Sequence, residues 1–561
     1  REISRRTEVT DLPDDPLKAL QTLLADVPDE ERSVVLTRHL AALAGWAGYV
    51  KWRAAEAGHP WAKAAPITLA DFLAARLFLA RQFAEAPAAV PAPEAPEAAA
   101  IWTEAWEETW RRGLTAALAA KPAAKAPAPE AQLVFCIDVR SEVLRRHLER
   151  TGPWATLGFA GFFGAPVSVK PFEDDRAYAS CPVLLTPKHI IPEVAAPGAE
   201  AAAETRKTGL ARLRTAKGTL RALKESVAGA FGFVEASGVV FGAAMVARTV
   251  APAGFGGAVA RLAERVAPPA PTAHRVALSC DGAEGEPTGL SPAEMAFFAE
   301  GALRIMGLTE NFAKLVLLCG HGGAATNNPF AAGLDCGACG GNRGGPNARI
   351  MAAVFNDAGV RATLAGRGIA IPEGTVFLAA EHNTTTDALT IFDEAPAARH
   401  AAVLAQLKTD LAIARKAAAA ERLARMPNAK AADPVAAVER RAADWAQVRP
   451  EWALARNAGF IVADRSFTRG LDLEGRCFLH SYDWRADTTG SSLEVILTAP
   501  MVVAEWINTQ YYFSTVDNTV FGAGSKVTHN VVGGFGVMQG NASDLMTGLP
   551  LQSVASADGV P

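Results

Sequence analysis

The sequence predicts a mixed α/β protein whose central sheet is mostly parallel and flanked by helices. Half of the 561 residues are hydrophobic and 20% are charged, so the chain can bury a sizeable core. Four apolar runs end in polar or glycine-rich turns, and continuous runs of this kind are typical of strands buried on both faces. Helix-compatible stretches follow them, which favours a ligand site at the carboxyl ends of parallel strands. The runs are 132–140, 275–282, 314–323 and 375–387.

The segments around these strands have different compositions. Residues 1–84 are predicted to be α-helical; in TLADFLAARLFLARQF, leucine and phenylalanine recur at helical spacing and Thr68 can cap the first turn. Residues 85–131 contain Ala/Pro-rich linkers on both sides of a short tryptophan-bearing helix. The rest is the predicted α/β core with solvated helical insertions: 132–561, with insertions near 200–250 and 395–445.

Charge and cysteine content exclude several classes of protein. The chain has 55 basic and 59 acidic residues in no large block, so it lacks the basic patch expected of a nucleic-acid-binding protein. No basic segment followed by an apolar run opens the chain, so we expect no secretory signal. Seven thinly spread cysteines predict free thiols in a reducing, cytoplasmic compartment.

One apolar stretch raises the question of a membrane span. Residues 227–247 are long enough to cross a bilayer, and Gly238 and Gly242 have a spacing that lets two helices approach closely. Four glycines and Glu235 argue against a spanning helix. Since a buried segment of a large core has the same composition, we expect a core segment here.

The first apolar run ends in VFCIDVRSE, which places a thiol, a carboxylate and a guanidinium two residues apart. Because side chains alternate along a strand, Cys136, Asp138 and Arg140 are expected on one face. Ser141 is then available to cap a following helix. Taken alone, the segment is more typical of a buried cysteine beside an Asp–Arg pair.

A second segment adds ligands of matching chemistry. The stretch LCGHGGAATNNPFAAGLDCGACGGNRGG carries one imidazole and further thiols among glycines that let the backbone approach a small site. Two thiolates, one imidazole and one carboxylate form a tetrahedral zinc set. The natural choice of ligands is Cys136, Asp138, His321 and Cys336.

The other cysteines allow rival interpretations. Cys336 and Cys339 form a CxxC, which serves as a redox pair or as half of a structural zinc site, although the sequence contains no second CxxC. Cys319 lies two residues before the histidine and is interpreted as a packing or tuning neighbour, with a ligand role left open. The remaining thiols are expected to be buried small hydrophobes: Cys181, Cys280 and Cys477.

These motifs resemble a known family. The CxDxR pattern followed by a distant histidine and cysteine is similar to the zinc site of β-carbonic anhydrases, although here the last two ligands are fifteen positions apart. That spacing resembles the DabA family, the large zinc subunit of two-subunit inorganic-carbon transporters. Long strings carry the resemblance, among them WINTQYYFSTVDNTVFGAGSKVTHNVVGG (506–534) and GVMQGNASDLMTGLPLQSV (536–554). Family members usually carry more sequence at both ends, so both termini are expected to be truncated.

The resemblance implies energy-coupled hydration of CO2 to bicarbonate, on a β-carbonic-anhydrase-like sheet. It implies that Cys136, Asp138, His321 and Cys336 hold Zn²⁺. It further implies that Arg140 draws Asp138 away, so that a water molecule takes the freed position and supplies hydroxide. It also implies a peripheral subunit on the cytoplasmic face of the inner membrane, with an integral, cation-conducting partner of the DabB type.

Two other functions stay open: a free-standing β-type carbonic anhydrase, and a zinc-stabilised scaffold or redox protein. The stretches 227–247 and 498–521 are apolar enough to dock onto a membrane partner. Two accessory roles are considered, although packing or an ordinary hydrogen bond more often explains such residues. They are Phe330 and Leu334 for an apolar CO2 pocket, and His382, Asp387 and His480 as proton relays.

Overall fold

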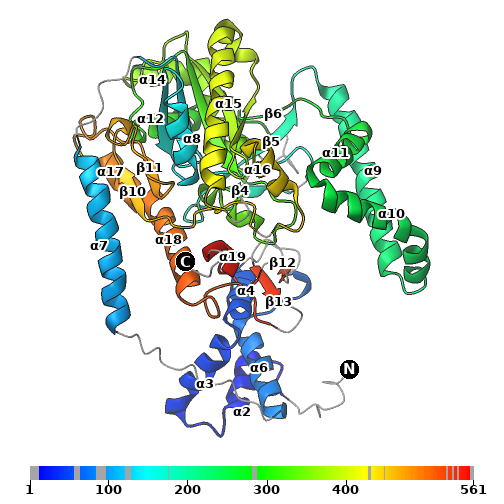
Figure 1. Cartoon of the computed structure of the whole chain (residues 1–561). Coiled ribbons are helices and arrows are strands. Elements are labelled where there is room, and N and C mark those ends of the chain that lie inside the picture. The colour runs from blue at the N-terminus through cyan, green and yellow to red at the C-terminus, as the bar shows by residue number, and fades with distance from the viewer. Residues whose placement is uncertain are drawn as a thin grey trace. The chain divides into compact units, whose positions relative to one another are not determined.

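The structure is a computed structural model, drawn in Figure 1. It describes residues 12–55, 63–83, 97–120, 128–174, 176–280, 287–426, 431–447, 449–525, 529–532, 536–539 and 543–555. The chain forms two compact units: 1–114 with 513–551, and 115–512 with 552–561. Most of the predicted Ala/Pro-rich linkers lie outside the described residues, and the predicted boundaries at 84 and 131 stay a prediction.

The smaller unit is mainly helical. Its helices are α2 (Pro16–Leu23), α3 (Asp29–Ala41), α4 (Ala44–Ala55) and α6 (Leu69–Phe83). Leucines of α2 and α6 form its apolar core. Thr68 caps α6 as predicted, because its hydroxyl accepts from the Asp71 backbone N–H at 3.3 Å. The unit also contains the antiparallel pair β12 (His529–Val532) and β13 (Gly536–Gln539). Helix α7 (Glu97–Ala119) is the predicted tryptophan-bearing helix.

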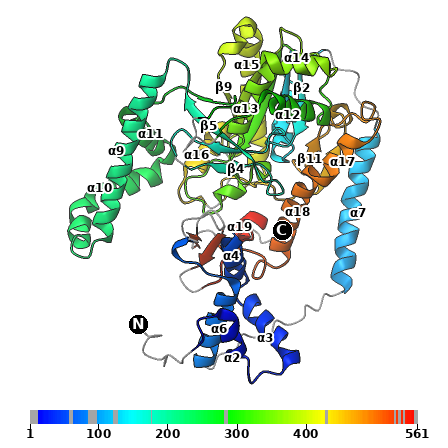
Figure 2. The ribbon, with the colours of Figure 1, turned by 180° about the vertical axis from the view of Figure 1, so that it is seen from behind.

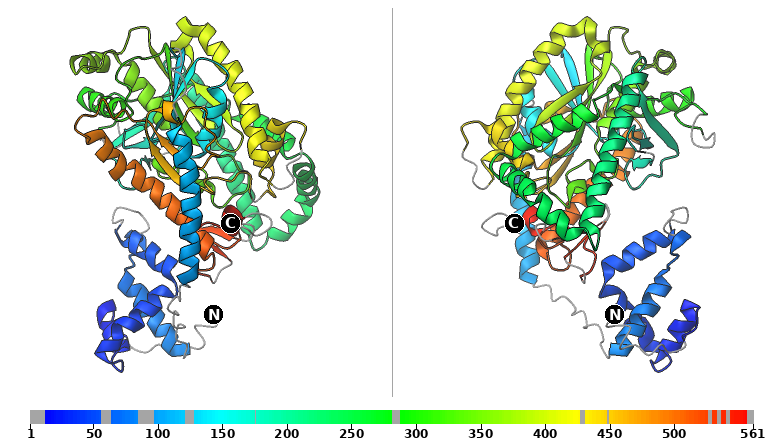
Figure 3. Two further views of the ribbon diagram at one scale, coloured as in Figure 1. Left: turned by 60° about the vertical axis from the view of Figure 1, so that its left-hand side comes forward. Right: turned by 90° about the vertical axis from the view of Figure 1, so that its right-hand side faces the viewer.

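The larger unit contains the predicted, mostly parallel sheet (Figure 3). Its strands lie in the order β2-β1-β7-β8-β9, and only the pairing of β8 with β9 is antiparallel. Three of the four predicted runs are strands of this sheet. The bounds are β1 (Ala131–Cys136), β2 (Trp154–Phe159), β7 (Leu315–Gly322), β8 (Val376–Asn383) and β9 (Ala388–Phe392).

Helices cover both faces of this sheet, which explains why its strands are apolar throughout. On one face, Val316 and Phe377 pack against α12 (Pro292–Ile305), α13 (Gly345–Asn356) and α14 (Ala358–Gly366). On the other face, Leu133 and Leu317 pack against α8 (Arg140–Leu148) and α15 (Ala401–Leu423). The two apolar clusters hold the carboxyl ends of β1 and β7 in fixed register.

The remaining predicted run is 275–282, and its described residues, 275–280, form no strand of the central sheet. Val276 is buried but Leu278 is 54% exposed, and only isolated bridges join this segment to the residues before α12. A second sheet precedes it, with the order β4-β3-β5-β6. Its strands are β3 (Val167–Lys170), β4 (Tyr178–Ser180), β5 (His189–Ala195) and β6 (Thr272–His274). Strand β1 leads into α8 within a few residues as expected, whereas a long loop separates β7 from α13 and β8 turns directly into β9.

Both predicted insertions are helical, but they differ in their surroundings (Figure 2). The first contains α9 (Glu200–Glu225), α10 (Ala230–Val250) and α11 (Pro252–Val266). No residue of α10 is buried, so the expected core segment is wrong. Within the described residues, α10 is the one helix long and apolar enough to span a membrane. In the second insertion, α15 packs on the sheet, and it is followed by α16 (Pro434–Ala443).

The segments after α16 complete the larger unit. A parallel pair, β10 (Gly459–Val462) and β11 (Cys477–His480), lies close to the carboxyl ends of β1 and β2, because Leu479 N donates to Ile137 O and Ser481 N donates to Gly158 O. Helices α17 (Ser491–Thr498) and α18 (Pro500–Val516) follow.

Candidate metal centre

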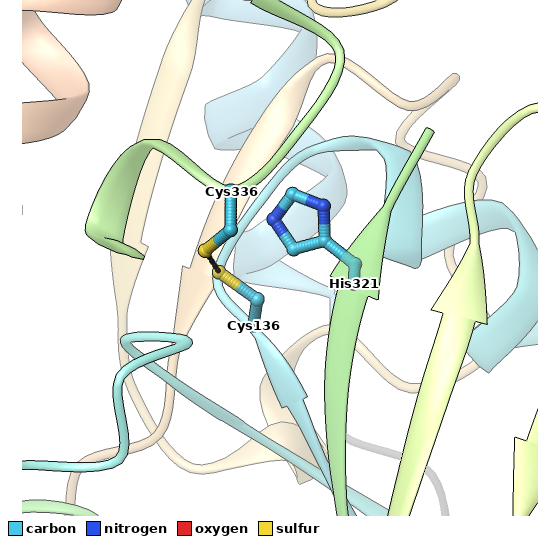
Figure 4. Close-up of side chains that lie close together, drawn as sticks. All are labelled: Cys136, His321 and Cys336. Atoms are coloured by element: carbon cyan, nitrogen blue, oxygen red, sulfur yellow. Dashed lines mark hydrogen bonds between the residues drawn. The ribbon is translucent and has the colours of Figure 1, made fainter. Parts of the chain in front are cut away.

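Three predicted ligands meet at the carboxyl end of the central sheet (Figure 4). Cys136 is the last residue of β1, and His321 lies near the end of the adjacent parallel strand β7. Cys336 comes from the loop after β7, where its backbone N–H donates to Asn342 O at 3.0 Å. Since parallel strands end at the same edge of a sheet, the pairing of β1 with β7 brings the first two ligands together.

The three side chains offer ligand atoms at metal-binding separations. The two sulfur atoms and a ring nitrogen all lie within 4.8 Å of one another, and the sulfurs of Cys136 and Cys336 are 3.9 Å apart. All three residues are buried. Among the described residues neither ring nitrogen of His321 has a hydrogen-bond partner. A buried imidazole without a partner is costly, and a metal ion would satisfy it. The donor set therefore fits a bound metal ion.

Gly161, which sequence reasoning missed, lies directly against this group. A side-chain carbon at this position would be 2.6 Å from the Cys336 sulfur and 3.1 Å from the Cys136 sulfur. Both separations are shorter than normal contacts, so only glycine leaves room for both thiols. The sequence feature that could have indicated this glycine is the GFFG stretch after β2.

Asp138 lies beside the three ligands but is held by Arg140. Its Oδ1 accepts from the Arg140 backbone N–H and Nε, both at 2.9 Å, and its Oδ2 accepts from Nη2 at 2.8 Å. The same Oδ2 is 3.5 Å from His321 Nε2. Strand β1 ends at Cys136, so the predicted strand alternation does not continue to Asp138. A tight turn into α8 brings the pair together instead.

The predicted capping role of Ser141 is wrong. Helix α8 begins at Arg140, and its N-cap is Val139, which makes no side-chain cap. The Ser141 hydroxyl donates to the carbonyl oxygens of Cys136 and Asp138 at 3.0 and 2.9 Å. Ser141 therefore stabilises the turn that carries both residues.

Arg140 makes three further contacts through Nη1. It donates to Leu334 O at 2.8 Å, to Thr384 Oγ1 at 3.1 Å and to Glu451 Oε1 at 3.1 Å. Sequence reasoning missed Thr384 and Glu451, because they are distant in sequence and belong to no metal-ligand pattern. Buried Arg140 is thus shared between two buried carboxylates.

The charges of these groups follow from burial and from their neighbours. Burial disfavours the ionised form of Asp138, but the charges of Arg140 and His321 outweigh it and hold the pKa well below its usual range. Burial raises the pKa of Glu451, although Arg140 opposes this. The Cys336 thiol and burial raise the pKa of Cys136, so metal binding releases protons from the thiols.

The other predicted histidines are paired away from the three ligands. His382 Nε2 lies 2.9 Å from Asp387 Oδ1, and Arg422 Nε lies 2.8 Å from Asp387 Oδ2. His480 Nδ1 lies 2.8 Å from Ser481 O, and its ring packs edge-on against Phe159. Burial lowers the pKa of His480 to about 4. The expected proton-relay role of His382, Asp387 and His480 stays a prediction.

The remaining cysteines and loop residues take varied positions. Cys319 is buried in the apolar cluster beneath α8 and α15. Cys181 and Cys477 are buried as predicted, whereas Cys280 is exposed, so its predicted burial is wrong. Cys339 is buried, and its backbone N–H donates to Cys336 O at 3.0 Å. Leu334 is buried and contributes its carbonyl to Arg140, while Phe330 is partly exposed.

The fold and site define an α/β protein with a buried thiolate–imidazole group that can hold a metal ion. Comparison of the sequence with protein families shows a match over residues 2–560 to the family described as "Probable inorganic carbon transporter subunit DabA". The chain belongs to the DabA family. No solved structure gives a significant match.

Curated relatives cover nearly the whole chain. The protein from Salinibacter ruber is 48% identical over 98% of this chain and 70% of its own length. Proteins from Haloarcula marismortui and Legionella pneumophila are 45% and 44% identical over 99% of this chain, covering 70% and 74% of their own lengths. All three are named "Probable inorganic carbon transporter subunit DabA".

Proposed function

We propose that the protein carries out zinc-dependent, energy-coupled hydration of CO2 to bicarbonate, as the peripheral subunit of a two-subunit membrane transporter of inorganic carbon. The names of its relatives support the transport of inorganic carbon and a partner subunit. The observation that carries the chemistry is that Arg140 holds Asp138 beside a group of three buried ligands. Catalytic zinc sites have three protein ligands and one open position, whereas structural sites have four.

The donor set favours zinc as the metal. Thiolates together with imidazole are the ligands that Zn²⁺ prefers, whereas Mg²⁺ and Ca²⁺ prefer oxygen. Zinc in such a site supplies Lewis-acid activation of water, which is the chemistry that CO2 hydration requires. While Asp138 is bound to Arg140, three residues remain to ligate the metal ion: Cys136, His321 and Cys336.

Arg140 and Asp138 act as a positioning pair. The planar guanidinium binds both carboxylate oxygens and keeps its charge, so it can hold Asp138 away from the metal position. Asp138 Oδ2, 3.5 Å from His321 Nε2, then presents a carboxylate oxygen at the site, where it can accept a hydrogen bond. Glu451, Thr384 and the Leu334 carbonyl hold the opposite edge of the guanidinium.

The proposed partner is an integral membrane, cation-conducting subunit of the DabB type, with this chain on the cytoplasmic face of the inner membrane. Hydration of CO2 releases one proton for each bicarbonate formed. Removal of that proton, driven by ion flow through the partner, would make the reaction proceed in one direction. The word subunit in the names of the relatives supports the existence of a partner.

The test of the site is the zinc content of the purified chain. We expect about one zinc per chain, lost in Cys136→Ala, His321→Ala and Cys336→Ala. Cys319→Ala is the matched control, since it removes a buried thiol outside the group. Zinc retained in the three variants, or absent from the parent, would contradict the ligand set.

Hydration assays separate the three candidate functions. Activity that requires the membrane partner supports the proposal, whereas equal activity of the isolated chain supports a free-standing carbonic anhydrase. Asp138→Ala and Arg140→Ala are expected to keep the fold and zinc but lose about a hundredfold in hydration rate. If these variants fail to fold and the parent protein shows no hydration activity, the result supports the third candidate, a zinc-stabilised scaffold.

A further inference from the structure

Helix α10 has an unusual environment for an apolar helix. Its 21 residues contain one acidic and one basic side chain, and none of the residues is buried. Large apolar side chains are exposed over most of the helix surface, with Phe231 at 85%, Val239 at 84% and Val240 at 69%. A helix that is apolar on all sides belongs in a protein core or among lipids. The described part of this chain provides no core around it.

The neighbouring helix α9 carries positive charge. It has seven basic and three acidic residues, and most of the basic side chains are exposed. Arg212, Arg214 and Lys217 form no ion pair with any residue that the structure describes. Basic side chains beside an exposed apolar helix complement a surface with anionic headgroups.

The connections of this insertion limit how α10 can meet a bilayer. The three helices form an arm with α10 at its far end (Figure 2). The arm leaves from β5 and returns into β6, and these strands pair with each other through Ala195 and Thr272. Both ends of the arm are therefore fixed at one place on the same side of any membrane. The C-terminal end of α10 is itself anchored, since Trp445 Nε1 donates to Thr249 Oγ1 at 3.3 Å.

We propose that α10 lies in the interface of a lipid bilayer with anionic headgroups, and that the basic residues of α9 bind those headgroups. Because the arm enters and leaves from one side, α10 inserts from that side, with its apolar side chains at the boundary of headgroups and acyl chains. The inference uses neither the metal site nor its chemistry. It assigns membrane contact to a particular element of this chain, separate from any contact with a partner subunit.

Co-sedimentation of the full chain with lipid vesicles tests the proposal. We expect binding to vesicles of phosphatidylcholine with a quarter phosphatidylglycerol, and about tenfold weaker binding to phosphatidylcholine alone. The double variant Val239→Glu/Val240→Glu is expected to weaken binding to the anionic vesicles by about tenfold or more. Arg214→Glu/Lys217→Glu is expected to remove the preference for anionic lipid. Val183→Glu, an exposed apolar position outside the arm, is the matched control and should bind like the parent.

Other occupants of α10 give different results. Dimers in solution that Val239→Glu/Val240→Glu dissociates would show that a second copy covers the helix and would overturn the proposal. Binding only to vesicles that contain the membrane partner would assign α10 to that partner and would also overturn it. Cys136→Ala should bind vesicles like the parent, so failure of the zinc site and failure of membrane binding are distinguishable.

Discussion

Arg140 illustrates how one buried side chain can organise a site. Its guanidinium uses one edge for Asp138 and the other for Glu451, Thr384 and the carbonyl of Leu334. A guanidinium is planar and has five donors in fixed directions, so contacts on one edge determine where the other edge points. The hydrogen-bond partners of Nη1 therefore fix the orientation of the guanidinium, and with it the position of the Asp138 carboxylate.

Variants at Glu451 test this positioning. Glu451→Gln keeps an oxygen acceptor for Arg140 and Thr384, so we expect it to retain most of the hydration activity. Glu451→Leu removes that acceptor and should lower the hydration rate by about tenfold, while zinc content stays unchanged. The measurements are elemental analysis and hydration kinetics with the partner present. Equal loss in both variants would show that the acceptor oxygen is not the relevant feature.

Gly161 provides a second test at the scale of one residue. We expect Gly161→Ala to reduce zinc per chain by more than half, because the added methyl group would lie 2.6 Å from the Cys336 sulfur. Gly333→Ala is the matched control, since an added methyl group there has no neighbour within 4 Å. Full zinc content in Gly161→Ala would mean that the loop moves aside at little cost.

Because the pKa of His480 is lowered in the folded protein, we expect the stability of the protein to depend on pH. Burial lowers its pKa to about 4 in the folded protein, from an ordinary value of 6.5. Between these values the unfolded chain binds a proton that the folded chain does not, so stability falls as the pH drops from 6.5 to 4. A tenfold difference in proton affinity between the two states corresponds to about 1.4 kcal/mol, so His480 accounts for a loss of about 3 kcal/mol at most.

Urea unfolding of the parent and of His480→Gln at pH 7 and pH 4.5 measures this effect. The variant should lose less stability between the two pH values, because all other titrating groups are common to both proteins. An equal loss in the two proteins would assign the dependence to other groups.

At the scale of elements, the sequence predicts best where burial is uniform. Strands β1, β7 and β8 are continuous apolar runs because helices cover both of their faces. The run 275–282 has a similar amino-acid composition, but Leu278 is exposed to solvent, which composition alone does not reveal. The same limit applies to α10, whose apolar sequence suits a protein core equally well. In the run 275–282 and in α10, burial depends on the tertiary surroundings of the segment and not on its composition.

A capping box at the start of α12 allows a test of local stability. The Ser291 hydroxyl accepts from the Glu294 backbone N–H at 3.3 Å, and Glu294 Oε2 accepts from the Ser291 backbone N–H at 2.9 Å. We expect Ser291→Ala to lower the free energy of unfolding by about 1 kcal/mol, measured by urea unfolding. Ser291→Thr, which keeps a hydroxyl that can accept from the Glu294 backbone N–H and donate to Glu294 Oε2, should recover most of the loss. No recovery would assign the effect to another contact of the serine.

At the scale of the whole molecule, the candidate site joins distant parts of the chain. Residue chemistry predicted the thiols, the imidazole and the Asp–Arg pair, because these types of side chain define metal sites. It did not predict Gly161, Thr384 or Glu451, since only the folded chain brings them to the site. The expected zinc ligand set remains a prediction until the metal is measured.

Removal of metal is expected to destabilise the larger unit. A ligand that binds only the folded state stabilises it by about 2.7 kcal/mol at a free concentration one hundred times its dissociation constant. Thermal unfolding with zinc and with a chelator should therefore give a higher melting temperature with zinc. Cys136→Ala is the control and should show no such difference. A chelator effect of equal size in that variant would place the metal elsewhere.

The distance along the chain between Cys136 and Cys336, 200 residues, also has a consequence for biogenesis. Strand β1 cannot pair with β7 until the intervening segment has been synthesised, and contacts of such high sequence separation form slowly. The Cys136 thiol therefore lacks the other two ligands until β7 and the loop with Cys336 have been synthesised. Binding of a metal ion by these ligands would consequently be a late event, and a reducing environment during synthesis would protect the nascent chain from oxidation.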